Sequence, residues 1–297
     1  SSGSTMSSQA IGIDLGTTFS AVAYVNQHGM PEIIPNAHGD RITPSVILFD
    51  NDQVVIGIEA KNNAEAYVGQ IAQFIKLHMG DPNYRFQYKD KSRTAVELSA
   101  LLLQELKKGA EQRLKQTIKY AVITVPAYFG QRERKATIEA GEMAGLKVLK
   151  IINEPTAAAV AYGLNHRGSK KRCLVYDLGG GTFDVTIIEI HNNVIRVRST
   201  EGDPKLGGKD WDERLMDYVA QVFQETYPDE GPLTDKFIQH NLRTRCISAK
   251  FALTQRPETR LDVQYRNKPL RITITREKFE ELTKDLLDRT IEQTKTA

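Results

Sequence analysis

The 297-residue sequence predicts an α/β protein of two similar lobes, each with a mixed β-sheet flanked by helices. The first indication is a repeated phrase: residues 11–25 read IGIDLGTTFSAVAYV and residues 174–188 read LVYDLGGGTFDVTII. Each phrase is an apolar strand that ends in Asp-Leu-Gly, a tight Gly/Thr turn and a second apolar strand. The second indication is that strand-like and helix-like segments alternate along the rest of the chain. Matching hairpins about one domain length apart predict two lobes that face each other.

The order of the elements follows from hydrophobic periodicity. Strand-like segments are rich in Val, Ile, Tyr and Thr and end at Gly, Pro, Asn or Asp. They cover residues 10–14, 20–25, 45–50, 120–125, 147–152, 172–177, 183–190, 194–200, 259–265 and 270–274. Helical segments carry apolar residues three or four positions apart. They cover residues 94–114, 130–144, 154–164, 208–227, 233–254 and 276–294.

The domain organisation is read from two polar segments. Residues 1–8 begin with SSGSTM, which has neither a basic nor an apolar region, so we expect a disordered tag rather than a signal peptide. Residues 165–171 (NHRGSKK) are polar and basic and immediately precede the second hairpin. We therefore expect the first lobe to cover residues 9–167 and the second to cover residues 168–297.

Composition excludes several classes of protein. A hydrophobic content of 40% and a charged content of 26% are typical of a soluble globular protein, and no run of eighteen apolar residues is present to span a membrane. The net charge of +3, with both signs interspersed, argues against a dedicated nucleic-acid binder. Cys173 and Cys246 are too few for a disulfide framework or a thiolate metal site, which fits a reducing cytoplasm.

The turns of the two hairpins are candidate phosphate-binding loops. The first comprises Gly16, Thr17 and Thr18 after Asp14, and the second comprises Gly179, Gly180, Gly181 and Thr182 after Asp177. Glycines let the backbone approach a ligand, free backbone N–H groups hold phosphate oxygens, and paired carboxylates hold Mg²⁺. One such loop alone could be a plain β-turn with a polar lip. Two in register favour a nucleotide clamped between the lobes.

Two further segments offer charged groups to such a site. In residues 151–163 (IINEPTAAAVAYG), Asn153 can cap a thin, alanine-rich helix whose first turn holds Glu154. Glu154 is either part of a plain capped helix or an active-site carboxylate. Lys76, in the apolar segment AQFIKLHMG, is either a snorkelling surface cation or a group that reaches a γ-phosphate.

Five segments together resemble the nucleotide-binding domain of the 70-kilodalton heat-shock chaperone family, DnaK type. They are GIDLGTTFSAVAYV, TVPAYFGQRERKATIEAGEMAGL, IINEPTAAAVAYGL, VYDLGGGTFDVTI and GDPKLGGKDWDERL. The DLGTT turn is shared with actins and sugar kinases, whereas the NEPTAAA segment with VPAYF and DLGGGTFD is specific to the chaperones. The resemblance runs from about residue 10 to the end of the chain.

The resemblance implies an actin-like ATPase fold with ATP or ADP and Mg²⁺ in the cleft between the lobes, together with K⁺. It implies that the catalytic residues are Lys76, Glu154, Asp177 and Thr182, and that the metal-binding residues are Asp14, Asp177 and Asp184. It implies that the nucleotide is held by Gly16, Thr17, Thr18, Phe19, Gly179, Gly180, Gly181, Gly207 and Gly208. Pro126 and Arg134 match the switch that communicates the nucleotide state between the lobes.

The sequence departs from the family in the helix that faces adenosine. That helix normally carries Glu, Lys, Arg and Ser, whereas the aligned positions here are Ile247, Lys250, Phe251 and Thr254. Either Phe251 stacks on the purine while Ile247 offers the ribose no acceptor, or the two form a core pair and the nucleotide lies elsewhere. The chain also ends at Ala297, before the family's second adenosine loop, so we expect a C-terminally shortened second lobe.

The resemblance implies the ATP-hydrolysing domain of a cytoplasmic, monomeric chaperone, active in protein folding and the stress response. Its nucleotide state would control the binding of unfolded polypeptides to a substrate-binding domain that is absent from this sequence. The partners implied are a J-domain co-chaperone and a nucleotide exchange factor. Alternatives are an actin-like filament protein and a nucleotide-binding regulatory module with little turnover; a sugar kinase is disfavoured because no sugar-binding polar cluster stands out. Turnover by the shortened chain is left open.

Overall fold

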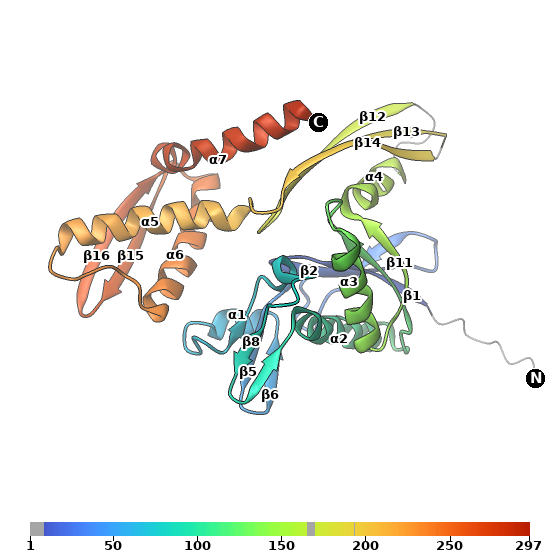
Figure 1. Cartoon of the computed structure of the whole chain (residues 1–297), viewed down its shortest axis with the longest axis horizontal. Coiled ribbons are helices and arrows are strands. Elements are labelled where there is room, and N and C mark those ends of the chain that lie inside the picture. Colours follow the sequence, from blue (N-terminus) through green and yellow to red (C-terminus); the bar gives the residue numbers. More distant parts are fainter. Residues whose placement is uncertain (1–8, 165–169, 193) are drawn as a thin grey trace, which may run out of the picture.

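The computed structural model describes residues 9–164, 170–192 and 194–297, which form the predicted two-lobed α/β architecture (Figure 1). The expected tag at residues 1–8 lies outside the described residues. So does most of the segment in which we expect the boundary between the lobes, because residues 165–169 are not described.

The main sheet of the first lobe has six strands in the order β11-β10-β1-β2-β3, with β4 also pairing with β2. They are β1 (Ala10–Leu15), β2 (Phe19–Val25), β3 (Pro31–Ile33), β4 (Thr43–Pro44), β10 (Tyr120–Val125) and β11 (Lys147–Asn153). β1 pairs antiparallel with β2 and parallel with β10, and β10 pairs parallel with β11. The sheet is therefore mixed, as predicted.

Two helices belong to the core of this sheet, namely α2 (Ala95–Leu114) and α3 (Gln131–Met143). Leu98, Leu103 and Leu106 of α2 are buried in one cluster with the strand residues Ile13 and Ile123. A capping box between Thr94 and Glu97 begins α2 at its predicted start. The core thus holds the carboxyl ends of β1 and β10 in fixed positions.

The outer part of the first lobe consists of short elements that periodicity detects poorly. They are β5 (Ile47–Asp50), β6 (Gln53–Ile56), α1 (Ile58–Asn63), β7 (Ile71–Ala72), the 3-10 helix η1 (Ile75–His78), β8 (Phe86–Tyr88) and β9 (Lys91–Arg93). Only the first was predicted, as residues 45–50. The others have two to six residues, which is too short for a helical or alternating pattern to show.

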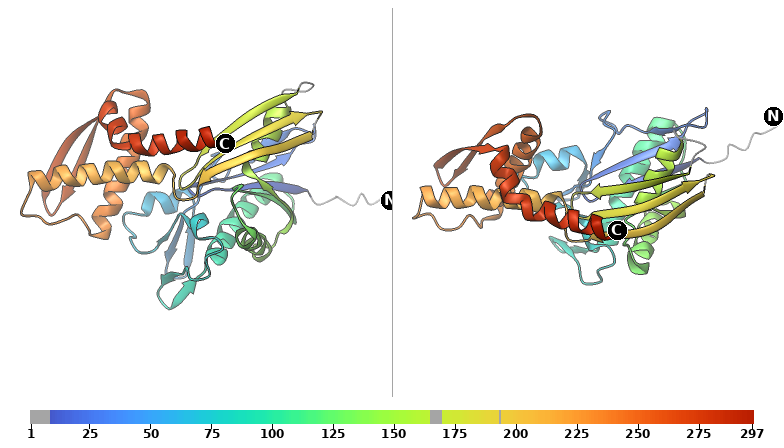
Figure 2. Two further views of the ribbon diagram at one scale, coloured as in Figure 1. Left: turned by 45° about the horizontal axis from the view of Figure 1, so that its top comes forward. Right: turned by 90° about the horizontal axis from the view of Figure 1, so that it is seen from above.

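The inner part of the second lobe is the sheet β12-β13-β14, comprising β12 (Lys171–Leu178), β13 (Phe183–His191) and β14 (Val194–Asp203). Its described strands are all antiparallel, because short connections join each strand to the next. The helix α4 (Glu154–Leu164) contacts β10 and β11 of the first lobe and all three strands of this sheet. α4 therefore lies at the junction of the two lobes (Figure 2).

The outer part of the second lobe contains α5 (Gly208–Thr226), α6 (Lys236–Gln255), β15 (Glu258–Tyr265) and β16 (Lys268–Thr275). Their shared core is formed by Leu215, Phe223, Leu242 and Ile274, among others. The last helix, α7 (Arg276–Thr296), runs from this part back to the inner sheet, as Figure 2 shows. Its first turns pack on the outer core, whereas Leu286 is buried with residues of β13.

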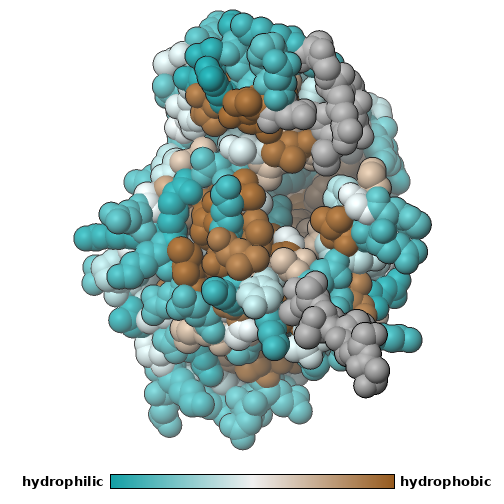
Figure 3. All heavy atoms as spheres, turned by 90° about the vertical axis from the view of Figure 1, so that its right-hand side faces the viewer, coloured by the Kyte–Doolittle hydropathy of each residue, from teal (hydrophilic) through white to brown (hydrophobic). Residues whose placement is uncertain are grey.

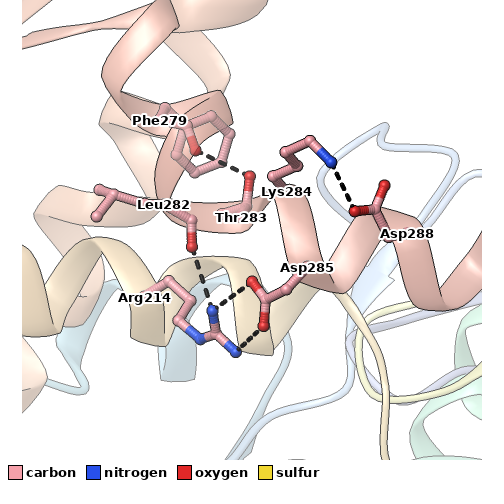
Figure 4. Close-up of polar contacts among 7 residues, drawn as sticks. All are labelled: Arg214, Phe279, Leu282, Thr283, Lys284, Asp285 and Asp288. Atoms are coloured by element: carbon pink, nitrogen blue, oxygen red, sulfur yellow. Dashed lines mark hydrogen bonds and ion pairs between the residues drawn. The ribbon is translucent and has the colours of Figure 1, made fainter.

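A bidentate ion pair fastens α7 to α5 (Figure 4). The guanidinium of Arg214 donates to both carboxylate oxygens of Asp285, at 2.6 and 2.8 Å, and to the carbonyl oxygen of Leu282 at 3.2 Å. By contrast, Lys284 pairs with Asp288, one turn further along α7. The Arg214 contact therefore joins two elements, and the Lys284 contact lies within one.

Apolar side chains remain exposed on the inner part of the second lobe. On β12, Leu174, Tyr176 and Leu178 alternate with less exposed residues, and Val160 of α4 is also exposed. Figure 3 shows apolar atoms gathered across the middle of the side of the molecule that is on the right in Figure 1. No helix among the described residues is long and apolar enough to cross a membrane.

Candidate functional site

The first predicted phosphate loop connects β1 to β2 and is held from behind by Ser45. The hydroxyl of Ser45 donates to the carbonyl oxygen of Gly16 at 2.9 Å, and its amide donates to that of Thr18 at 2.9 Å. A Cβ atom on Gly16 would lie 2.0 Å from the carbonyl oxygen of Phe19, so only glycine fits there. A loop whose carbonyl groups are occupied in this way presents N–H donors to a ligand.

The second predicted loop connects β12 to β13 and is held by the start of α5. The amide of Gly208 donates to the carbonyl oxygen of Gly179 at 2.8 Å, and the amide of Lys209 donates to that of Gly180 at 2.9 Å. The loop is closed by a bond from the Gly179 amide to the carbonyl oxygen of Thr182 at 2.9 Å. The first turn of α5 thus fixes the loop, and places Gly207 and Gly208 beside it.

The two loops touch each other across the cleft, which explains their glycines. A Cβ atom on Gly180 would lie 2.4 Å from Cγ2 of Thr18, and one on Gly181 would lie 2.7 Å from Cδ2 of Leu77. A Cβ atom on Gly207 would lie 2.4 Å from the backbone of Gly181. A side chain at Gly180 or Gly181 would push the second loop away from the first lobe, and one at Gly207 would push the start of α5 away from the second loop.

Lys76 and Glu154 form an ion pair within the cleft. The Lys76 ammonium contacts Oε1 of Glu154, and the two side chains are only 9% and 18% exposed. Lys76 lies on η1 of the first lobe, and Glu154 is the first residue of α4. Burial raises the pKa of Glu154, whereas Lys76 lowers it and the carboxylates of Asp14 and Asp177 raise it. Lys76 is therefore a cleft residue and not a snorkelling surface cation.

The three predicted metal-binding aspartates belong to the same electrostatic cluster. Asp177 and Asp184 are cross-strand partners on β12 and β13. Asp14 lies beside Thr124 of β10, whose hydroxyl donates to Oδ1 of Asp14 at 3.2 Å. Burial raises the pKa of Asp177, and Lys76 lowers it. Burial and then the neighbouring carboxylates of Glu154 and Asp177 raise the pKa of Asp184 to about 7. The cluster is therefore short of positive charge.

The cluster fits a hydrated cation better than a directly ligated one. Oδ1 of Asp184 is buried and has no hydrogen-bond partner among the described atoms, which is costly unless a cation or water satisfies it. No three His, Cys, Asp or Glu side chains in the described part of the chain are placed to ligate one metal ion together. Mg²⁺ usually keeps several of its waters, so carboxylates can hold it through that shell.

Arg134 and Tyr128 connect this cluster to the first lobe. The Arg134 guanidinium donates to the carbonyl oxygen of Phe129 at 2.8 Å and to Oδ1 of Asn153 at 2.6 Å. The Asn153 side-chain oxygen thus accepts a hydrogen bond from Arg134 just before the start of α4. Tyr128, which the sequence analysis did not single out although it lies in the VPAYF segment, hydrogen-bonds to Thr182, and burial raises its pKa.

A cavity of about 270 Å³ lies between the two lobes, beside both loops. Its volume approaches the range of about 300–1,000 Å³ that is common for ligand pockets. The first lobe contributes Thr17, Thr18, Phe19, Ser45, Val46, Lys61, Gln73 and Phe74. The second contributes Leu178, Gly179, Gly180, Gly208, Lys209, Asp212, Ile247, Lys250 and Phe251. The sequence analysis missed Lys61, Lys209 and Asp212, although the last two lie in the GDPKLGGKDWDERL segment.

The residues of α6 that depart from the family pattern face this cavity. Ile247, Lys250 and Phe251 line it, and neither Ile247 nor Phe251 belongs to the buried core of the outer second lobe. The reading in which these two side chains form a core pair is therefore wrong. Thr254 is not among the lining residues, and its hydroxyl donates to the carbonyl oxygen of Phe251 at 2.7 Å.

Comparisons with known proteins agree with this geometry. The family described as Hsp70 protein matches residues 10–88 and 69–297. The chain is 45% identical over 288 residues to the chaperone protein DnaK of Thermotoga neapolitana, an alignment that covers 94% of this chain and 48% of that protein. The chain thus spans about half the length of this curated relative. The identity and the family match together show that the chain belongs to the Hsp70 family.

Proposed function

We propose that this chain is the nucleotide-binding domain of a molecular chaperone and that it binds and hydrolyses ATP with Mg²⁺. The observation that carries the proposal is the buried Lys76–Glu154 ion pair, which lies in one electrostatic cluster with Asp14, Asp177 and Asp184. Membership of the Hsp70 family supports ATP or ADP and Mg²⁺ as the ligands in general terms. We assign the first lobe to residues 9–167 and the second to residues 168–297.

In this proposal the residues act by positioning and by neutralising charge. The two loops hold the phosphates through backbone N–H groups, those of Thr17, Thr18 and Phe19 in the first loop and those of Gly179 and Gly180 in the second. The glycines beside them, Gly16, Gly181, Gly207 and Gly208, let the backbone come close to the phosphates. Lys76 donates to the γ-phosphate and orients the attacking water, and Glu154 fixes the direction of the Lys76 ammonium. Thr182, held by Tyr128, donates its hydroxyl at the same end.

Cations complete the charge balance of the proposed site. Mg²⁺, when bound, neutralises the charge on the phosphate oxygens. Asp14, Asp177 and Asp184 would hold its water shell and a neighbouring K⁺ ion. The unpartnered Oδ1 of Asp184 supports this assignment, since a buried carboxylate oxygen needs a partner.

We further propose that the nucleotide state is passed on through Pro126 and Arg134. Arg134 supports this role, because its guanidinium joins the loop after β10 to Asn153, the residue before Glu154. The proposed readout is the binding of unfolded polypeptides to a substrate-binding domain outside these residues. The proposed partners are a J-domain co-chaperone and a nucleotide exchange factor, and the proposed setting is a monomer in the cytoplasm, where Cys173 and Cys246 remain free.

The test of the proposed chemistry is Lys76→Ala. Charge near the γ-phosphate matters more to the transition state than to the bound ground state, so single-turnover hydrolysis should fall on the order of 10²-fold or more. ATP affinity should stay within about tenfold. The matched control is Lys107→Ala, which also breaks a Lys–Glu pair, at 3.2 Å to Glu111, but on α2. Normal hydrolysis by Lys76→Ala would show that Lys76 has only a structural role.

A further inference from the structure

The outer half of the cavity is lined by one face of α6 that carries an exposed aromatic ring. Ile247, Lys250 and Phe251 are spaced i, i+3 and i+4, so they share that face. The Phe251 side chain is 62% exposed, although other apolar residues of α6, such as Leu242 and Leu253, are buried. An exposed phenyl ring in the wall of a cavity is available to stack on a flat ligand.

The charged groups around this ring provide donors and almost no acceptors. Asp212 contributes the only carboxylate among the residues that line the cavity, and its Oδ1 lies 2.7 Å from the Lys250 ammonium. Lys61 from the first lobe and Lys209 from the second form no ion pair among the described residues, although both line the cavity. A sugar hydroxyl placed against α6 would therefore meet ammonium groups and the side chain of Ile247, with no free carboxylate to accept from it. The uncharged polar side chains that line the cavity, those of Thr17, Thr18, Ser45 and Gln73, belong to the first lobe.

We infer that Phe251 and Ile247 determine the nucleotide specificity of the cleft, an inference that rests on the proposed function. The base stacks on Phe251, and the 2′-hydroxyl of the sugar is not recognised. The site therefore accepts 2′-deoxynucleoside triphosphates nearly as well as ribonucleoside triphosphates. Discrimination against a missing hydroxyl arises when a buried polar partner is left unpaired, and Ile247 offers no such partner.

The first experiment measures the affinities of ATP and 2′-deoxy-ATP by calorimetry in the presence of Mg²⁺. The parent chain should bind the two nucleotides with dissociation constants within about threefold of each other, which is less than the contribution of one strong hydrogen bond. Binding is measured instead of hydrolysis, so a slow or absent ATPase does not affect the comparison. A preference for ATP of about tenfold or more would overturn the inference.

The second experiment tests stacking with Phe251→Ala. Loss of the ring should weaken ATP and 2′-deoxy-ATP equally, by about tenfold, because stacking on a base is indifferent to the sugar. Phe237→Ala is the matched control, since Phe237 is 53% exposed on the first turn of the same helix and does not line the cavity. Unchanged affinities in Phe251→Ala would overturn the stacking role.

The third experiment restores an acceptor with Ile247→Glu. The new carboxylate should create a preference for ATP over 2′-deoxy-ATP of about tenfold, the contribution of one hydrogen bond to a charged group. Ile291→Glu, at a side chain that is 42% exposed on α7, should create none. If Ile247→Glu also shows no preference, position 247 does not face the sugar. If the parent chain binds neither nucleotide, the proposed function fails together with this inference.

Discussion

Asp184 is the residue whose titration the fold changes most clearly. Its pKa is raised from 3.8 to about 7, first by burial and then by the nearby carboxylates of Glu154 and Asp177. Between these two values the folded chain binds a proton that the unfolded chain has lost. The contribution of Asp184 to the free energy of unfolding should therefore decrease as the pH rises from about 4 to 7 in the absence of metal.

Asp184→Asn should remove this dependence. With divalent metal chelated, the melting temperature of the variant minus that of the parent should increase as the pH rises from about 4 to 7. Above pH 7 this difference should stay constant. Asp229→Asn, at an exposed carboxylate between α5 and α6, serves as the control. A difference that does not change with pH would show that Asp184 is not protonated in the folded chain near neutrality.

At the scale of elements, the docking of α5 on the second loop depends on the lack of a side chain at Gly207. Gly207→Ala would place a Cβ atom 2.4 Å from the backbone of Gly181, so either the loop or the helix must move. We expect a loss of about 1–3 kcal/mol in the free energy of unfolding and weaker nucleotide binding, measured by urea denaturation and calorimetry.

Gly109→Ala provides the opposite outcome within the same chain. Gly109 lies inside α2, and a Cβ atom there would meet nothing within 4 Å. This substitution should stabilise the chain by about 0.5–1 kcal/mol, because alanine loses less conformational freedom than glycine in a helix. If Gly207→Ala were equally harmless, the close contact between α5 and the loop would not exist in solution.

The attachment of α7 to α5 is a second property of elements, and Arg214→Ala tests it. We expect a loss of about 1 kcal/mol in the free energy of unfolding, a modest value because Arg214 and Asp285 are 38% and 61% exposed. The loss should shrink as the pH falls through the pKa of Asp285, which the hydrogen bond from Arg214 holds below its ordinary value. Lys284→Ala, which removes the exposed pair with Asp288 within α7, should cost less, because solvent screens that pair strongly. Equal losses would mean that Arg214 does not join the two helices.

At the scale of the whole molecule, the outer parts of the two lobes are joined next to the cleft. The side-chain amide of Asn241 on α6 donates to Oε1 of Glu65 at 2.5 Å, and the Arg243 guanidinium lies 6.0 Å from the ring of Phe74. Phe74 also lines the cavity, so the contact with Arg243 lies at its rim, whereas Glu65 and Asn241 line a separate pocket on the outer side. We expect a bound nucleotide to leave as the outer parts of the two lobes separate, which would open both contacts.

Glu65→Ala should therefore speed nucleotide release by about tenfold, the equivalent of one hydrogen bond to a charged group. The measurement is stopped-flow release of a fluorescent ATP analogue. Glu59→Ala is the control, because Glu59 lies on α1 of the same lobe and, among the described residues, its carboxylate pairs with His38 of that lobe alone, at 4.0 Å. Identical release rates for both variants and the parent would show that the Asn241–Glu65 contact does not hold the lobes together.

Much of the fold was predictable from local sequence. The hairpins β1–β2 and β12–β13 were predicted because the same phrase, an apolar strand, Asp-Leu-Gly, a Gly/Thr turn and a second apolar strand, occurs twice in the sequence. The long helices α2, α5, α6 and α7 were found because their apolar periodicity spans several turns. The elements between β6 and β9 escaped prediction because their few residues are ordered by contacts with distant parts of the chain.

Some features of the candidate site were likewise predictable from the sequence, and others depend on the tertiary structure. Sequence alone indicated which turns can approach a ligand, because glycines gather in them. The structure adds the reason at Gly16 and Gly180, where a Cβ atom would collide with neighbouring atoms. The sequence also led to the Hsp70 family, which the comparisons confirm. Only the tertiary structure decided that Lys76 pairs with Glu154 and that Ile247 and Phe251 face the cavity. The reason is that charge, burial and ligand access depend on which distant residues the fold brings together, and no local pattern encodes that.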